Sequence, residues 1–195
     1  PLLSLAQEKS PWTNETEVAV VNVGGNTESE SYSAKQKVSY TFDQNIITAA
    51  GRYLQATAFS VETAKSWDAT LKFEHELSNK WSVFVQRVAE SNVYAGFTQR
   101  DNTDVGGKYY FIKTDPEKFF GEIGLRASET LTNGVTTSSN SGRYYLEYAK
   151  KFNEATSGIF WVEHLSNFKD SSAYMTNYEP SVSVVLSKIF SLKIS

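Results

Sequence analysis

The sequence predicts an all-β protein, an antiparallel up-and-down transmembrane β-barrel of about 12 strands. Apolar and polar residues alternate with a period of two in segments of roughly 10 to 15 residues, which indicates strands with two unlike faces. Turn-forming clusters recur every 34 to 38 residues, and aromatic residues accompany them. The chain of 195 residues provides ten complete strands, near 12–24, 29–42, 46–57, 63–77, 81–90, 101–113, 119–131, 143–152, 155–166 and 174–187, and an eleventh that begins at Phe190.

The composition excludes several classes of protein. The chain has no cysteine, so disulfides, thiolate metal sites and cysteine catalysis are excluded. Its 19 basic and 22 acidic residues alternate in sign along the chain and form no basic footprint, so we expect no nucleic-acid partner. The hydrophobic content of 40% is too high for a disordered chain. No apolar run approaches the roughly 20 residues of a membrane-spanning helix.

Residues 66–77 show the alternation most clearly. One face of this segment carries Trp67, Ala69, Leu71, Phe73, His75 and Leu77, and the other carries Ser66, Asp68, Thr70, Lys72, Glu74 and Glu76. A helix would mix the two sets, whereas a strand separates them. In an outer-membrane barrel the apolar set faces lipid and the polar set faces the lumen.

The turn-forming clusters form two series. Short turns begin at Asp43, Ser78, Asp115, Asn153 and Ser187. Longer polar segments lie between them, at 24–29, 60–63, 91–101, 132–142 and 167–173. Short turns at one end and long loops at the other are typical of outer-membrane barrels. We expect the loops at 91–101 and 132–142 to be the best places for recognition, because loops on rigid scaffolds often carry function.

An aromatic residue lies beside each short turn. We interpret Phe42, Trp81, Phe119, Phe152 and Phe190 as an interfacial aromatic girdle. A second set lies towards the loop ends and includes Tyr32, Tyr53, Trp67 and Tyr174. The alternative is that aromatics simply favour strands and pack a soluble core.

The polar faces of the strands predict a charged lumen. Its charged residues are Lys35, Lys37, Arg52, Asp68, Lys72, Glu74, Glu76, Lys108, Glu122, Arg126, Arg143 and Glu147, together with Glu15, Glu17, Glu163 and Glu179. Both signs are mixed, so we expect opposite charges to pair and to fill most of the lumen, with a structural role or a narrow path for permeation. Arg87 and Gln36 break the pattern on the outward face, where they would contact lipid or another subunit.

Several short stretches resemble one family in their order and spacing. They are Gly24-Gly25-Asn26-Thr27-Glu28, Leu77-Ser78-Asn79-Lys80-Trp81, Glu90-Ser91, Tyr94-Ala95-Gly96-Phe97, Arg100, Gly106-Gly107-Lys108-Tyr109-Tyr110, the turn at 113–115 and Gly121-Glu122-Ile123-Gly124. With them, most of residues 12–195 resembles the DUF481 family, also called YdiY-like or salt-induced outer-membrane proteins. The resemblance implies a β-barrel in the outer membrane of a Gram-negative bacterium and supplies no catalytic or binding residues.

These inferences predict a non-enzymatic, porin-like outer-membrane protein without a cofactor or metal. We expect residues 1–11 to be an N-terminal periplasmic segment and 12–195 to be the barrel domain, incomplete at its C-terminus and continued by roughly 15 to 30 residues, because bacterial barrels have even strand numbers. Its partners would be outer-membrane lipids, lipopolysaccharide and a homo-oligomeric copy. Two other classes stay open: a soluble lipocalin-like barrel that binds small molecules, and an outer-membrane hydrolase. The only histidines, His75 and His164, lie far apart in sequence and suggest no catalytic site.

Overall fold

Eleven antiparallel strands, joined in chain order, form one sheet in the computed structural model, which describes residues 10–25, 28–170, 172–186 and 191–195. The strands are β1 (Trp12–Val23), β2 (Ser29–Phe42), β3 (Asn45–Ala58), β4 (Val61–Glu76), β5 (Trp81–Asn92), β6 (Phe97–Lys113), β7 (Glu117–Thr132), β8 (Val135–Lys151), β9 (Thr156–Asn167), β10 (Tyr174–Val185) and β11 (Ser191–Ile194). A 3-10 turn, η1 (Val93–Ala95), joins β5 to β6. The predicted all-β meander is therefore confirmed. The helix in the described part of the chain is too short to cross a membrane.

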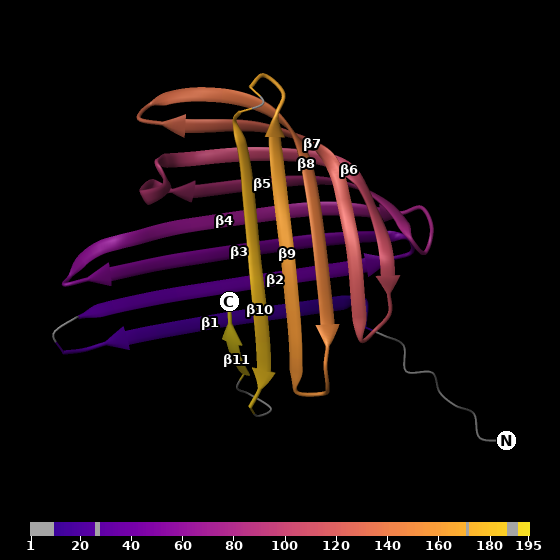
Figure 1. The fold of residues 1–195 in the computed structure, drawn as a ribbon, viewed down its shortest axis with the longest axis horizontal. Helices are drawn as coiled ribbons and strands as arrows, with labels where there is room; N and C mark the ends of the chain where they lie inside the picture. Colours follow the sequence, from indigo (N-terminus) through magenta and orange to yellow (C-terminus); the bar gives the residue numbers. More distant parts are fainter. Residues whose placement is uncertain (1–9, 26–27, 171, 187–190) are drawn as a thin grey trace.

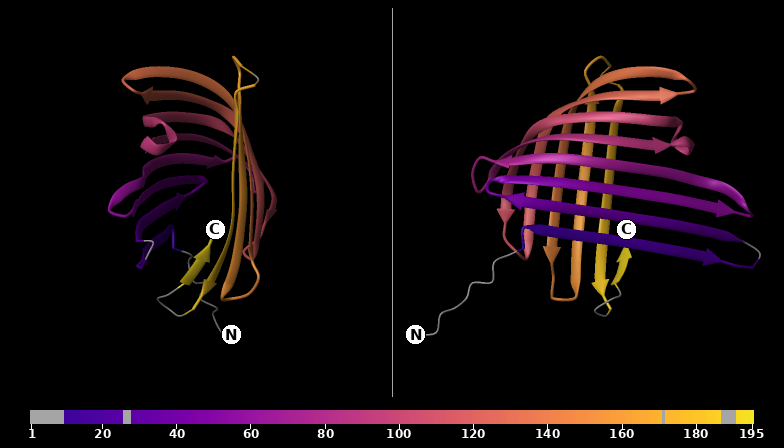
Figure 2. Two further views of the ribbon diagram at one scale, coloured as in Figure 1. Left: turned by 60° about the vertical axis from the view of Figure 1, so that its left-hand side comes forward. Right: turned by 180° about the vertical axis from the view of Figure 1, so that it is seen from behind.

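The sheet bends over on itself. Figure 1 shows β1 to β5 running across the direction of β9 and β10, with the curved strands β6, β7 and β8 between them. The left view of Figure 2 shows that the two halves of the sheet face each other, so that the sheet has a concave and a convex face. Register shifts interrupt the ladders between Ala56 and Thr57, between Glu90 and Asn92 and between Tyr110 and Ile112. Such bulges increase the local twist of a strand.

Two glycines let the curved strands approach closely. Gly106 of β6 lies directly opposite Gly124 of β7. A Cβ atom on Gly124 would lie 2.5 Å from the carbonyl oxygen of Val105, and one on Gly106 would lie 2.9 Å from Cζ of Phe84. Any side chain at either position would therefore force the backbones apart or displace the buried Phe84 ring.

The predicted closed barrel of about 12 strands is not what the described residues form. The sheet is open, since β1 and β11 stand at opposite ends of the strand order and do not pair with each other. The physical reason lies in β11, which has four residues and pairs only with Val182–Val185 of β10. The two ends still meet through side chains, because Lys193 Nζ lies 3.3 Å from Glu17 Oε1 of β1.

The predicted long loops are also corrected. Residues 135–142 of the predicted loop 132–142 belong to β8, and Asn133 and Gly134 alone make the turn. Both have positive φ angles, 51° and 78°, which suits a two-residue hairpin turn. The predicted loop 91–101 shrinks to η1 and Gly96, because β6 begins at Phe97. The predicted contrast between short turns and long loops is therefore much weaker than the sequence suggested.

The two faces of the sheet differ in chemistry. Large apolar residues on the convex face are exposed, among them Leu71 at 59% and Ile123 at 63%. The concave face instead buries charged groups, such as Asp104 at 0% and Glu74 at 5% exposed. The buried hydrophobic residues in the described part of the chain are only Phe84, Phe97 and Phe120. The usual arrangement of a water-soluble domain, with apolar residues inside, is inverted.

Candidate functional site

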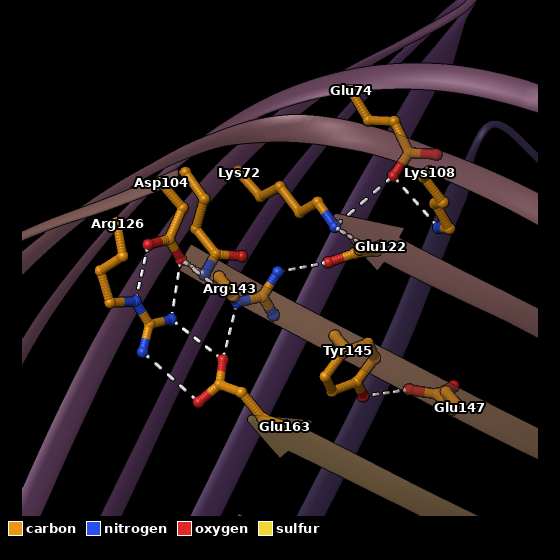
Figure 3. Close-up of polar contacts among 11 residues, drawn as sticks. Lys72, Glu74, Asp104, Lys108, Glu122, Arg126, Arg143, Tyr145, Glu147 and Glu163 are labelled. Carbon is orange, nitrogen blue, oxygen red and sulfur yellow. Dashed lines mark hydrogen bonds and ion pairs between the residues drawn. The ribbon is translucent and has the colours of Figure 1, made fainter. Parts of the chain in front are cut away.

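Eight charged residues on the concave face form one connected cluster, which we call the central network. Its members come from β4, β6, β7, β8 and β9 and are Lys72, Glu74, Asp104, Lys108, Glu122, Arg126, Arg143 and Glu163 (Figure 3). The bend of the sheet brings these strands within reach of one another. Lys72 of β4, for example, donates to Glu122 of β7, although two strands separate β4 from β7 in the sheet.

Arg143 is the centre of this network. Its Nη1 lies 2.7 Å from Glu122 Oε2, its Nε lies 2.7 Å from Glu163 Oε1, and the same Nε lies 3.6 Å from Asp104 Oδ2. Arg126 completes the arrangement, because its Nε and Nη2 donate to the two carboxylate oxygens of Asp104 at 2.7 and 2.8 Å. Bidentate pairs of this kind are among the strongest charge-assisted hydrogen bonds in proteins.

Glu74 connects the other half of the network. Its Oε2 lies 3.2 Å from Lys108 Nζ and 3.7 Å from Lys72 Nζ, and its Oε1 accepts a hydrogen bond from Ser82 Oγ at 2.7 Å. The network as a whole contains four carboxylates and four cationic side chains, so its formal charges cancel. No buried side-chain nitrogen or oxygen in the described part of the chain lacks a hydrogen-bond partner. This pairing offsets the large cost of enclosing charges.

The central network contacts the linings of two cavities. A cavity of about 1300 Å³ lies on the side towards β1–β3 and β8–β10 and is lined by Arg126 and Glu163 of the network. A second cavity of about 480 Å³ lies at the β4–β5 and β6–β7 turns, and Tyr110 is one of its lining residues. Lys108 Nζ lies 4.7 Å from the centroid of the Tyr110 ring. The two cavities share no lining residue among those described. The central network therefore reaches from the lining of the larger cavity, at Arg126 and Glu163, to the ring of Tyr110 in the lining of the smaller one.

The remaining predicted lumen residues also lie on the concave face, mostly as exposed pairs around the larger cavity. The closest contacts are Lys35 with Glu17 at 3.8 Å, Lys37 with Glu15 at 3.7 Å, Arg52 with Asp68 at 2.7 Å and Lys113 with Glu76 at 2.7 Å. Glu147 accepts a hydrogen bond from Tyr145 at 2.6 Å, and Glu179 lies 3.7 Å from Lys193. The sequence therefore predicted correctly which charged residues lie on the concave face. Of those sixteen residues, seven belong to the central network.

Sequence reasoning missed Asp104, which is the most deeply buried charge of the site. It lies four residues before Lys108 on β6, so the same alternation that selected Lys108 could have found it. Ser82, Gln86 and Asn102 were missed as well, and each donates to a carboxylate on this face. Uncharged donors of this kind carry no distinct signal in a sequence, because serine, glutamine and asparagine are common in loops and on exposed surfaces.

Aromatic side chains line the convex face near the short turns. Trp81 contacts Tyr109 at 4.7 Å between ring centroids, and the contacts continue through Phe111 and Phe119 to Tyr148. Phe42 stacks with Tyr40 at 5.7 Å at the corresponding end of β2. Of the other predicted girdle residues, Phe152 is exposed in the turn after β8, and Phe190 lies outside the described residues.

The two predicted polar exceptions on the convex face have polar neighbours. Arg87 Nη2 lies 3.3 Å from Asp101 Oδ1, and Nη1 lies 3.4 Å from Thr103 Oγ1. Gln36 accepts from Thr16 at 2.7 Å and donates to Asn14 at 2.5 Å. Each group therefore satisfies much of its hydrogen-bonding capacity within the sheet.

The two histidines lie apart from each other and from the central network. His75 Nδ1 lies 2.9 Å from Asn45 and His164 Nδ1 lies 2.8 Å from Thr176, in separate parts of the convex face. No group of three or more His, Cys, Asp or Glu side chains among those described is arranged to hold a metal ion.

Fold and site together define a single-sheet antiparallel β protein with an apolar convex face and a buried, charge-balanced network on its concave face. Residues 16–195 match the model of the family described as "Protein of unknown function, DUF481". The chain belongs to the DUF481 family, and the resemblance in its sequence motifs is thereby confirmed. No curated protein and no solved structure is significantly similar to it.

Proposed function

We propose that this chain is a β-barrel protein of the bacterial outer membrane, surrounded by lipid and lipopolysaccharide. Its central network fills the middle of the lumen. The network therefore has a structural role, or it leaves only a narrow path for water and small ions. One observation carries the proposal, which is the inversion of the two faces. A charged, buried concave face and an exposed apolar convex face suit a barrel whose outer solvent is lipid.

Two further features support a membrane location. The strands β1 to β10 have 12 to 17 residues, which exceeds the roughly 9 to 11 that cross a bilayer at a tilt. The ring contacts from Trp81 to Tyr148 place amphipathic side chains near one end of the strands, as at a membrane–water interface. In lipid the free edges of the sheet, at β1 and at β11, must also be paired, because unsatisfied backbone groups are costly there. The proposal therefore requires a closed barrel, of about 12 strands.

The soluble lipocalin-like alternative requires the apolar face of the sheet to point inward and the charged face to point to solvent. Its apolar residues would line the internal cavity, whereas most of the residues that line the cavity of about 1300 Å³ are charged or polar. Such a protein would also stay folded and monomeric in aqueous buffer, while 38 large hydrophobic residues are exposed among those that the structure describes. The behaviour of the purified protein without detergent separates the two possibilities.

Two spin-labelled variants on β7 test the proposal directly. The chain has no cysteine, so Leu125→Cys and Ser128→Cys each provide a unique labelling site. Leu125 lies on the convex face and Ser128 lines the larger cavity. In lipid vesicles we expect the label at 125 to collide with oxygen, which concentrates in lipid, and the label at 128 to collide with a water-soluble nickel chelate.

The matched pair makes the result decisive, because the two sites are three residues apart on one strand. Equal access of the nickel chelate to both labels would overturn the membrane location. A folded monomer that remains in buffer after detergent is removed would do the same.

The proposal includes contact between copies of the chain through β1 and β2. Asn14, Thr16 and Gln36 form a hydrogen-bonded polar group on the convex face of these strands. Polar groups facing lipid are costly, and a second protein surface would cover them. Native mass spectrometry in mild detergent tests this part, and a lone protomer in several detergents would refute it.

A further inference from the structure

Cationic side chains lie over nearly all aromatic rings of the concave face. Lys72 lies 4.3 Å from the Phe84 centroid, Arg100 lies 3.9 Å from Phe97 and Lys108 lies 4.2 Å from Phe120. The two tyrosine rings of this face are covered in the same way: Lys113 lies 4.8 Å from the Tyr110 centroid, and Arg143 lies 5.1 Å from the Tyr145 centroid. The concave face is thus built from repeated cation–π contacts, which gain strength where water is displaced.

Trp161 of β9 is the exception among the described aromatic residues of this face. It lines the larger cavity and stacks on Tyr145 with 6.1 Å between ring centroids and an angle of 24° between the ring planes. No lysine or arginine side chain in the described ranges lies over its ring. Yet tryptophan is the side chain that binds cations best through its ring.

Two carboxylates flank Trp161 on the neighbouring strands. Glu147 of β8 and Glu179 of β10 are its directly opposite partners in the two ladders, so all three side chains project from the same face. Glu179 pairs with Lys193 at 3.7 Å. Glu147 accepts a hydrogen bond from Tyr145 and forms no ion pair in the part of the chain that the structure describes. Among the described residues, therefore, no lysine or arginine neutralises its negative charge at this point of the cavity wall.

We propose that Trp161 and Glu147 form a binding site for an organic cation, such as an ammonium or guanidinium group that enters the larger cavity. The indole face would hold the cation as the other concave rings hold lysine and arginine, and the Glu147 carboxylate would supply the opposite charge. A cavity of about 1300 Å³ is large enough for either a free amine or a cationic side chain of another molecule. The site depends on the concave face alone and not on the membrane location.

Calorimetric titration of the detergent-solubilised protein tests this site. The probes are tetramethylammonium, which represents a free amine, and N-acetylarginine methylamide, which represents a protein side chain, each measured against sodium chloride at equal ionic strength. We expect saturable binding of at least one probe. The probe that binds more tightly shows whether the natural ligand is a free amine or a cationic protein side chain. Trp161→Leu should weaken that binding about tenfold and Glu147→Gln about threefold, since each removes one of the two attractive groups.

Matched variants control for folding and charge. Trp67→Leu removes a tryptophan from the convex face, and Glu154→Gln removes a carboxylate from the turn between β8 and β9. Both should bind the probe as the unaltered protein does. The proposal is overturned if neither probe binds beyond the sodium chloride control, or if Trp161→Leu and Trp67→Leu bind equally well. Because Glu147→Gln preserves size and shape, it keeps the test valid if Trp161→Leu misfolds.

Discussion

Arg143 and Glu122 form a buried ion pair across β7 and β8 without being opposite each other in the ladder. Nη1 of Arg143 lies 2.7 Å from Oε2 of Glu122, whereas the direct partners are Gly124 for Arg143 and Tyr145 for Glu122. The residue opposite Arg143 has no side chain, so its guanidinium extends along the concave face to reach the carboxylates around it. The position of a glycine thereby shapes the central network.

Replacement of Arg143 by methionine should strongly destabilise the protein. The variant leaves Glu122 without its arginine and weakens the neutralisation of Glu163 and Asp104, and removal of one partner from a buried pair typically costs about 3 to 5 kcal/mol. The measurement is urea unfolding of the protein reconstituted in lipid or detergent. Arg52→Met is the control, because Arg52 and Asp68 form an exposed pair worth about 0 to 1 kcal/mol. Equal losses for both variants would contradict a special role for the network.

The same pair can be examined by a double-mutant cycle. Glu122→Gln combined with Arg143→Met should cost less than the sum of the two single changes, because the double variant no longer buries a carboxylate that has lost its arginine and keeps only Lys72. We expect an interaction free energy of about 0.5 to 3 kcal/mol, the usual range for contacting residues. Additive losses would mean that the two side chains do not stabilise each other.

Alanine at Gly124 should destabilise the sheet by about 1 to 3 kcal/mol, the usual cost of overpacking. Its Cβ would lie 2.5 Å from the Val105 carbonyl oxygen, so β6 and β7 would have to separate. Gly107→Ala is a matched control, since a Cβ there has its nearest neighbour at 3.9 Å. Thermal unfolding of both variants provides the measurement, and a smaller loss for Gly124→Ala than for Gly107→Ala would refute the close approach.

The strands could be predicted from sequence because their two faces differ. The predicted bounds of β2 agree with the structure at both ends. The first half of β8 was mistaken for a loop, because Thr136 to Ser141 are all hydroxyl or amide residues and show no apolar alternation. The Asn133-Gly134 pair was the missed signal, since Asn-Gly favours the two-residue hairpin that the structure contains.

The pairing within the site could not be predicted in the same way. Alternation assigns Lys72 and Glu122 to one face but gives no information on their distance, since β4 and β7 are not neighbours in the sheet. Their contact depends on the bend of the sheet, which itself depends on Gly106, Gly124 and the register shifts. Long-range geometry of this kind is a property of the whole fold, and no local pattern encodes it.

The phenol of Tyr94 should titrate above its ordinary pKa of 10.0. Its hydroxyl donates to the Glu62 carbonyl oxygen at 2.7 Å in the turn before β6. Desolvation and the Glu62 carboxylate both raise the pKa of Tyr94, so the neutral form is favoured. The stabilisation of this turn is fully present below pH 10 and is lost as the pH rises through the higher folded pKa. Ultraviolet titration of tyrosinate, with Tyr94→Phe to identify the signal, should show a late-ionising group that the variant lacks.

Removal of part of the central network should open a path between the two cavities. Serine in place of Lys72, Glu74, Lys108 and Glu122 removes two acids and two bases, so the formal net charge does not change. Arg126 and Arg143 keep their contacts with Asp104 and Glu163. In planar lipid bilayers we expect small or no unitary currents from the unaltered protein and a several-fold larger conductance from this variant. The exposed pair Glu17 and Lys35 provides the control, because its replacement by serine leaves the network intact. Large, stable currents from the unaltered protein, or no increase in the quadruple variant, would show that the network does not block the lumen.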